Sequence, residues 1–432
     1  NGKTWKNITP KDLPTGGRVQ YIETSPHRKG SAYYAVYRYL LGDFAPYIYR
    51  TDDYGATWKK LTDGKNGIPA DWPTRVVRED PTREGLLYAG TEFGMFISFD
   101  NGAHWQTFDR NMPSVPITDI KVHHNDLVVS TQGRSMWIMD DITPLHSIGQ
   151  QTATAAAVLF KPRDAVRGRL GGGRGGFGGG GGGAAPGQAQ FPMYGATINY
   201  YLGRAPAGPV TIEISDAAGK VVRTYSSEAA TVAAGDAPAA AAPDDEEGGG
   251  GFRRAAPPVR LQTNIGMNRL TWDFNSTGGF TVPPGAYKVK MTVGSWSDTQ
   301  PITLKLDPRL AADNVTVADL REQYEHNLRM RDMVAEVGRV ANRVRQARTR
   351  LQSGGNADSL AAVKELAVVL FGPDEGVRYG RPGLQTQITY LAGMTTRVDQ
   401  RIGRDAAERY QTLRKELDAV EAKVNKTLGA EK

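Results

Sequence analysis

One short pattern occurs three times in the first quarter of the chain and limits what this part can fold into. The copies lie at residues 2–5 (GKTW), 51–58 (TDDYGATW) and 98–105 (SFDNGAHW). Their tryptophans are 53 and 47 residues apart. A repeat of roughly 50 residues indicates stacked supersecondary units, each of which buries an apolar face against its neighbour.

The segments between the copies predict β-strands. They are rich in aromatic and β-branched residues and bounded by turn residues, at positions 32–37, 46–50, 86–91 and 95–98. β-Rich repeats of this length are typical of propeller blades. Three blades do not close a propeller, because its first and last blades must pair to hide their edges. Since the chain starts inside a repeat, we expect the missing blades upstream in the same precursor or in a second chain.

Each complete copy of the pattern predicts a particular tight turn. Its aspartate can accept hydrogen bonds from the N–H groups of the turn, and its glycine tolerates the positive φ that the turn needs. Its tryptophan supplies an apolar body that wedges against the neighbouring unit. We therefore assign structural roles rather than catalytic ones to Thr51, Asp53, Gly55, Trp58, Ser98, Asp100, Gly102 and Trp105.

This pattern resembles the Asp-box of bacterial sialidases, xyloglucanase-type glycosidases and the sortilin propeller. Residues 127–141 resemble the closing blade of large, secreted, sortilin-like bacterial proteins that carry a glycosyl hydrolase label. The resemblance implies propeller blades over residues 1–148 and places the Asp-boxes away from the active-site face. It also implies an extracytoplasmic protein, whether periplasmic, cell-surface or secreted. The last blade lacks the box, so Asp140 and Asp141 receive no Asp-box role.

Glycine content and alternation divide the next part of the chain. Residues 149–194 include a glycine tract and predict a flexible linker. An RNA-binding reading of that tract is disfavoured, because it holds one aromatic residue and few arginines. Residues 195–308 predict a β-sandwich, with an insertion at 229–258 whose acidic patch lacks the spacing of a calcium loop. Trp272 and Tyr287 lie in motifs that resemble an immunoglobulin-like domain, where both would be structural.

Residues 309–432 predict helices. Thr316 can cap a first helix that ends at 353–355, and two further helices are expected at 359–371 and 384–402. A heptad seam follows, at Ala406, Tyr410, Leu413, Leu417, Val420, Val424 and Leu428. It predicts an antiparallel bundle that can also mediate self-association. The expected fold class is thus mainly β with an α-helical C-terminal part.

The sequence offers one candidate catalytic residue, Glu92, which follows a strand and can face a ligand. A glycosidase needs two carboxylates about 5–10 Å apart, and no second one is placed beside it. A turn role before Gly94 is the favoured alternative. No metal or cofactor is predicted, because the chain has 0 cysteines and the adjacent His123 and His124 should point to opposite faces of a strand.

Two functions therefore remain open. The first is a non-catalytic module that binds a glycan or protein and acts as a scaffold. The second is a glycoside hydrolase of the sialidase or xyloglucanase type, with catalytic carboxylates mostly in other blades. The net charge of +7 is diluted among both signs, so no nucleic-acid partner is expected. No membrane span is expected either, since no apolar run approaches about 20 residues.

Overall fold

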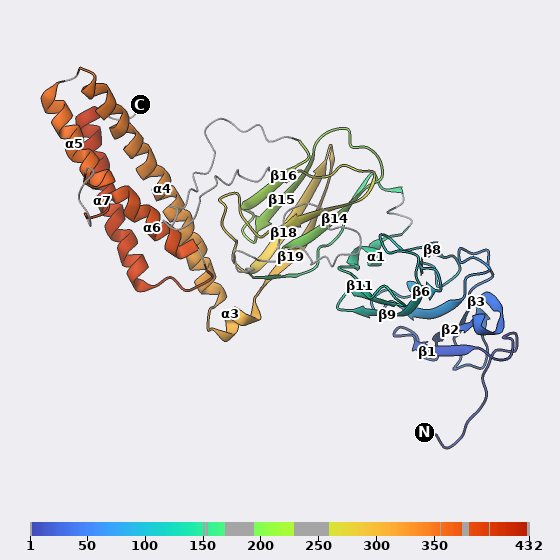
Figure 1. The fold of residues 1–432 in the computed structure, drawn as a ribbon. Helices are drawn as coiled ribbons and strands as arrows, with labels where there is room; N and C mark the ends of the chain where they lie inside the picture. The colour runs from blue at the N-terminus through green and yellow to red at the C-terminus, as the bar shows by residue number, and fades with distance from the viewer. Residues whose placement is uncertain are drawn as a thin grey trace. The chain divides into compact units, whose positions relative to one another are not determined.

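The computed structural model describes residues 2–149, 152, 154–168, 194–228, 259–354, 356–373, 380–396 and 398–429. The chain divides into two compact units, Asn1–Ala156 and Ala157–Lys432 (Figure 1). It combines several β-sheets with a helical region at the C-terminus. Most of the predicted linker (169–193) and the predicted insertion at 229–258 lie outside the described residues. No helix in the described ranges is long and apolar enough to cross a membrane.

The described part of the first unit holds three antiparallel sheets, each formed by strands consecutive in sequence. Sheet A contains β1 (Arg18–Thr24), β2 (Ala32–Arg38), β3 (Asp43–Thr51) and β4 (Lys59–Lys60), with a 3₁₀ turn, η1 (Tyr39–Leu41), between β2 and β3. Sheet B contains β5 (Thr74–Glu79), β6 (Leu87–Thr91), β7 (Met95–Ser98) and β8 (Gln106–Thr107). Sheet C contains β9 (Ile117–His123), β10 (Asp126–Thr131) and β11 (Met136–Met139), followed by helix α1 (Thr143–Ser147).

The three sheets are stacked through two apolar cores. Successive side chains of a strand point to opposite faces of the sheet, so a sheet can pack apolar side chains against a neighbour on each face. The core between sheets A and B contains Tyr33, Ala35, Ile48, Leu61, Ile68, Val77, Leu87, Ala89, Phe96 and Trp105. The core between sheets B and C includes Tyr88, Met95, Ile97, Ile117 and Val129. Sheets A and B are thus four-stranded meanders of the kind expected for propeller blades.

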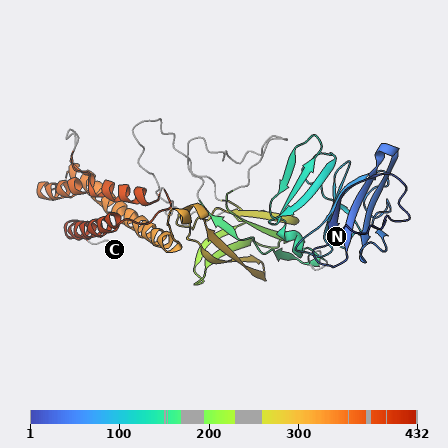
Figure 2. The same cartoon turned by 90° about the horizontal axis from the view of Figure 1, so that it is seen from below.

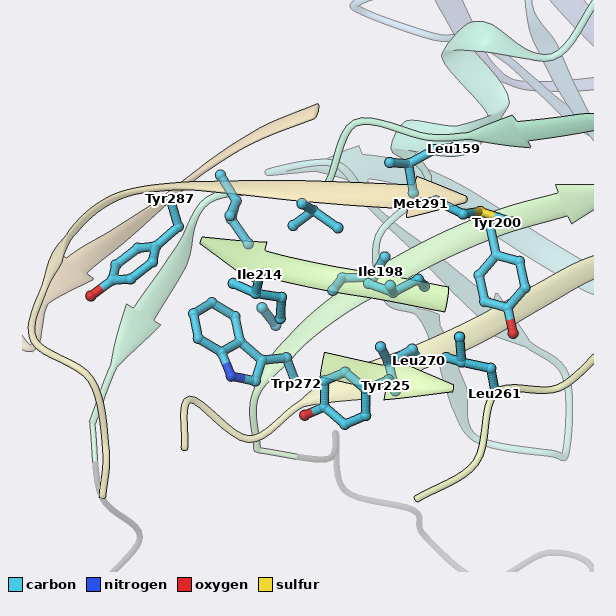
Figure 3. Packing of buried hydrophobic residues seen from close by; sticks show 14 of the residues in the cluster. Leu159, Ile198, Tyr200, Ile214, Tyr225, Leu261, Leu270, Trp272, Tyr287 and Met291 are labelled. Carbon is cyan, nitrogen blue, oxygen red and sulfur yellow. The ribbon is translucent and has the colours of Figure 1, made fainter. Parts of the chain in front are cut away.

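The second unit begins with two sheets packed face to face. One has the strand order β12 (Ala157–Leu159), β14 (Ala196–Leu202), β17 (Gly266–Trp272). The other has the order β13 (Ala165–Arg167), β19 (Trp296–Leu306), β18 (Gly285–Val293), β15 (Val210–Asp216), β16 (Val221–Ser226). Figure 3 shows their shared core, in which the rings of Trp272 and Tyr287 meet edge to face with centroids 5.5 Å apart. The Tyr287 hydroxyl donates a hydrogen bond to the Pro283 carbonyl at 2.7 Å, so both aromatics are structural.

Two of these strands lie inside the segment for which the glycine content predicts a linker. β12 pairs with β14, and β13 pairs in parallel with β19. Leu159 and Phe160 are buried, which explains why this stretch is ordered before the glycine tract begins. The linker prediction is therefore corrected over residues 157–167.

The helical region contains α3 (Pro308–Ala312), α4 (Val317–Gln352), α5 (Ala357–Phe371), α6 (Leu384–Thr396) and α7 (Arg404–Leu428). Helices α4 to α7 all contact one another and lie side by side in Figures 1 and 2. Thr316 caps α4 through a reciprocal pair of hydrogen bonds with Asp319. The seam residues Leu413, Leu417 and Val424 of α7 are buried in the shared core, as the heptad spacing predicts.

The third predicted helix ends earlier than expected, at Thr396 rather than 402. The segment from residue 398 onward is held by polar contacts to other elements. The Gln323 side chain donates a hydrogen bond to the Val398 carbonyl at 2.7 Å. Asp399 binds the guanidinium of Arg167 with two hydrogen bonds of 2.7 and 3.0 Å. This buried ion pair joins the helical region to strand β13 of the sandwich.

Candidate functional site

The first complete repeat forms a tight turn between β3 and β4. The carboxylate of Asp53 accepts hydrogen bonds from Thr57, at 2.8 Å from the backbone N and 2.6 Å from Oγ1. The Thr51 hydroxyl donates to Asp53 at 2.8 Å and accepts from the Gly55 N–H at 2.8 Å. The hydrogen bonds from Thr57, with that from Thr51, lower the pKa of Asp53 to about 2.

The second repeat builds the same turn between β7 and β8. The Asp100 carboxylate accepts from the His104 backbone N at 2.9 Å, and His104 Nδ1 lies 2.7 Å from its other oxygen. The Ser98 hydroxyl donates a hydrogen bond to Asp100 and accepts one from the Gly102 N–H, as the Thr51 hydroxyl does with Asp53 and Gly55. Burial raises the pKa of Asp100, but the hydrogen bonds from His104 and Ser98 outweigh it, so the pKa is lowered overall. The glycines of the two turns have φ of +86° and +82°.

The tryptophans connect each repeat to the one before it. Trp105 is 4% exposed, and its Nε1 donates to the Leu61 carbonyl of sheet A at 3.1 Å. Trp58 donates in the same way to the Ile8 carbonyl at 2.6 Å. Leu61 and Ile8 each lie three residues after the tryptophan of their own copy, Trp58 and Trp5. One docking contact therefore recurs along the chain with the period of the repeat.

An apolar groove of about 720 Å³ covers the face of sheet A that points away from sheet B. Its apolar lining includes Ile8, Leu13, Val19, Ile22, Tyr34, Val36 and Trp58. Tyr34 pairs across the strands with Tyr49, and Ala89 pairs in the equivalent place with Phe96. The Ala89–Phe96 pair is buried against sheet A, so the groove occupies the position where another sheet would cover sheet A.

Glu92 lies in the turn between β6 and β7. Its carboxylate forms an ion pair with Arg75, which is buried at the start of β5. Arg75 also donates to the Tyr39 hydroxyl at 3.0 Å and to the Gln132 side chain at 3.3 Å. This network links the β2–β3, β6–β7 and β10–β11 connections, so these loops lie at one end of the three sheets.

The same end carries a shallow hollow of about 430 Å³ that motif reasoning missed. It is lined by Phe44, Asp71, Trp72, Phe93 and Ser114. These residues lie at strand ends and in loops, where neither periodicity nor a motif marks them. Two of its aromatic residues, Trp72 and Phe93, fall in loops next to strands, and Phe44 lies at the start of a strand.

Other polar candidates have structural surroundings. Asp141 accepts hydrogen bonds from the N–H and hydroxyl of Thr143, at 3.3 and 2.5 Å, at the start of α1. The prediction that His123 and His124 point to opposite faces is wrong. β9 ends at His123, and His124 has φ of +50°, so their rings stack with centroids 4.0 Å apart. The described residues contain no group of three or more His, Asp or Glu side chains placed to hold a metal ion.

A buried carboxylate, that of Glu79, joins sheets A and B. Glu79 accepts hydrogen bonds from the Tyr33 hydroxyl at 3.2 Å and the Gly85 N–H at 3.1 Å. Arg28 lies 3.5 Å from the same oxygen and also bonds Asn101 in the second repeat turn. This network ties that turn to sheet A.

No protein-family model matches the sequence, and no curated protein matches it significantly. Similar solved structures include the GH74 xyloglucanase from Xanthomonas campestris, with 14% identity over 33% of this chain and 23% of that chain, at a TM-score of 0.25. The Niastella koreensis GH74 enzyme has 12% identity over 43% of this chain and 28% of that chain, at a TM-score of 0.24.

PorZ is a bacterial surface component of the type-IX secretion system of Porphyromonas gingivalis. It has 11% identity over 70% of this chain and 47% of that chain, at a TM-score of 0.18. The chain thus spans less than half the length of each of these three proteins.

Proposed function

We propose that sheets A, B and C are blades of a larger β-propeller, and that this propeller is an extracytoplasmic module that binds a glycan or a polypeptide. The groove on sheet A carries the proposal. Sheet A is covered by sheet B on one face and carries this large apolar groove on the other, and a further blade packed there would bury the groove.

The contacts and exposed side chains around the groove support one kind of occupant. Sheet B packs on sheet A through the Trp105 contact with Leu61, and Trp58 makes the same contact with Ile8 one repeat earlier. In β1, Val19 and Ile22 are apolar and exposed, whereas the central strands of sheet B are fully buried. The occupant is therefore another β-meander of the same repeat, supplied by a preceding stretch of the polypeptide or by a second chain.

Binding is proposed ahead of glycoside hydrolysis because of the surroundings of Glu92. One of its oxygens is engaged by the buried Arg75, which also holds Tyr39 and Gln132. Glu92 is thus one partner of an arginine that holds three loops together, which is a structural task. A propeller whose loop end is fixed by such contacts offers a preformed surface for a ligand.

The test introduces a charge into the groove of the full-length protein. Ile22→Asp changes a side chain that is 56% exposed in this chain, so sheet A itself should tolerate it. If a further blade covers Ile22, the charge becomes buried and the blade dissociates or the propeller loses stability. Val221→Asp, on exposed β16 of the second unit, is the matched control.

The readouts are limited proteolysis and the thermal midpoint of the first unit. We expect Ile22→Asp to expose new cleavage sites in the propeller and to lower its midpoint by several degrees, with no change for Val221→Asp. Equal behaviour of the two variants contradicts the proposed propeller.

A further inference from the structure

The hollow described above lies at the loop end of the three sheets. Phe44 is the second residue of β3, Asp71 and Trp72 precede β5, Phe93 lies in the β6–β7 turn, and Ser114 precedes β9. Successive hairpin connections lie at opposite ends of a meander, so the two repeat turns that hold Asp53 and Asp100 are at the other end. The hollow is thus separate from the turns and from the groove on sheet A.

The aromatic side chains of the hollow are partly supported from below. Trp72 packs against Phe96 of the core, with ring centroids 5.7 Å apart, and against Phe93 at 5.2 Å. Phe93 and Phe44 are 41% and 51% exposed. Apolar rings left exposed beside a buried core are costly in water unless a ligand covers them.

The polar groups of the hollow select the type of ligand. Asp71 is exposed and supplies carboxylate oxygens, which accept hydrogen bonds from hydroxyl donors. Ser114 is anchored by the bond from its hydroxyl to the Phe93 carbonyl at 2.9 Å. None of the five lining residues is Lys or Arg, so phosphate or another anion finds no counter-charge there.

We infer that this hollow is a carbohydrate subsite that holds a neutral pyranose ring. The C–H face of a pyranose is weakly positive and packs on the negative face of an aromatic ring, while its hydroxyl edge donates to a carboxylate. The volume of about 430 Å³ lies in the range of small-molecule sites, about 300–1,000 Å³. The inference deepens the proposed binding function and rests on it.

A proline-rich peptide is the main competitor, because such peptides also dock in aromatic grooves. Proline has no N–H or hydroxyl to donate, so it forms no hydrogen bond to the Asp71 carboxylate. The carboxylate therefore favours a polyol over a peptide, and the peptide serves as a competing probe in the test.

The experiment titrates the full-length protein with cellohexaose, xylohexaose and mannohexaose by calorimetry, and in parallel with a proline-rich decapeptide. Phe93→Ala removes an exposed ring, and Asp71→Asn removes the charge from an exposed side chain; neither change touches the core. Trp72→Phe keeps an aromatic surface where Trp72→Ala would disturb packing on Phe96. Tyr390→Ala, an exposed aromatic of α6, is the control.

We expect saturable binding of at least one hexasaccharide. Phe93→Ala and Asp71→Asn should each weaken it about tenfold, Trp72→Phe should weaken it less, and Tyr390→Ala should leave it unchanged. Hexasaccharide binding that Phe93→Ala does not weaken overturns the inference, as does binding of the peptide alone or of no probe at all. The proposed propeller is judged separately by Ile22→Asp, so the subsite can fail while the propeller stands.

Discussion

In the first unit, single charged side chains hold turns and loops in place through hydrogen bonds and ion pairs. The carboxylates of Asp53 and Asp100 each collect the hydrogen bonds of one tight turn. Arg75 collects partners from three connections at the loop end. Charged residues here position the backbone, and the surfaces they position remain apolar or aromatic.

Removing one hydroxyl should reveal this role at Asp53. Its pKa is about 2, and the largest cause is the hydrogen bond from the Thr57 side chain. We expect Thr57→Val to raise this pKa toward the ordinary value of about 3.9. An NMR titration of ¹³C-labelled aspartate carboxyls measures the change, with Thr107→Val on the exposed β8 as the control.

The sign of the pH effect follows from the lowered pKa. The charged Asp53 stabilises the turn above the unfolded pKa, about 3.9, and that stabilisation is lost as pH falls toward about 2. Thr57→Val should shrink this pH-dependent contribution. An unchanged Asp53 titration in Thr57→Val would mean that the turn does not depend on that bond.

At the scale of elements, the sheets depend on what lies between them. Trp105 is the one side chain that brings the repeat turn of sheet B into the core shared with sheet A. In the second unit, the ion pair between Arg167 and Asp399 does the corresponding work between β13 and the helices. Both contacts join segments that are distant in sequence.

Truncating Trp105 should loosen the contact between sheets A and B. Trp105→Ala is expected to cost about 3–5 kcal/mol, because it removes a buried aromatic and leaves a cavity. Hydrogen exchange of peptides from β3 and β7 measures the loss. Trp5→Ala, at a position that is 90% exposed, should change exchange by less than about 0.5 kcal/mol. Equal protection in the two variants would contradict the role of Trp105.

Neutralising Asp399 should detach the helical region from the sandwich. Asp399→Asn leaves the buried guanidinium of Arg167 without its counter-charge, at an expected cost of about 3–5 kcal/mol. Asp332→Asn is the control, because its pair with Arg331 is exposed and worth about 0–1 kcal/mol. Faster exchange of the 398–403 segment only in Asp399→Asn is the expected result. The same exchange in both variants would show that the pair does not join the two parts.

The sequence predicted strands well where apolar side chains alternate and poorly where charges are buried. β7 has the predicted bounds of 95–98, and β2 and β6 each differ from the predicted segments, 32–37 and 86–91, by one residue at one end. β5 was not predicted, because Arg75, Arg78 and Glu79 interrupt its apolar pattern, although the structure buries all three. Their partners come from other sheets and from distant loops, such as Asp119 for Arg78, and no local pattern reports them.

The candidate sites differ in the same way, between contacts that are local in sequence and contacts that only the fold creates. The turn residues were found because their hydrogen bonds are local, within four residues in each repeat. The hollow and the groove were not found, since each is assembled from several segments that only the fold brings together. The pairing of Glu92 with Arg75 was not predicted either, because Arg75 lies 17 residues earlier, on another strand.

At the scale of the whole molecule, the account depends on the groove of sheet A being an interface. Its apolar lining, its position one repeat before sheet B and the Trp58 contact with Ile8 support the proposal that another sheet covers it. A propeller completed in this way would bring the aromatic hollow into a continuous loop surface. The proposed binding function and the carbohydrate subsite then belong to one face.

The most direct measurement is an electron cryo-microscopy structure of the full-length protein. The account predicts a β-sheet seated against Tyr34, Val36 and Trp58, with apolar side chains filling the groove of about 720 Å³. A map in which these three side chains face solvent, while the rest of the polypeptide is folded and visible elsewhere, would contradict it.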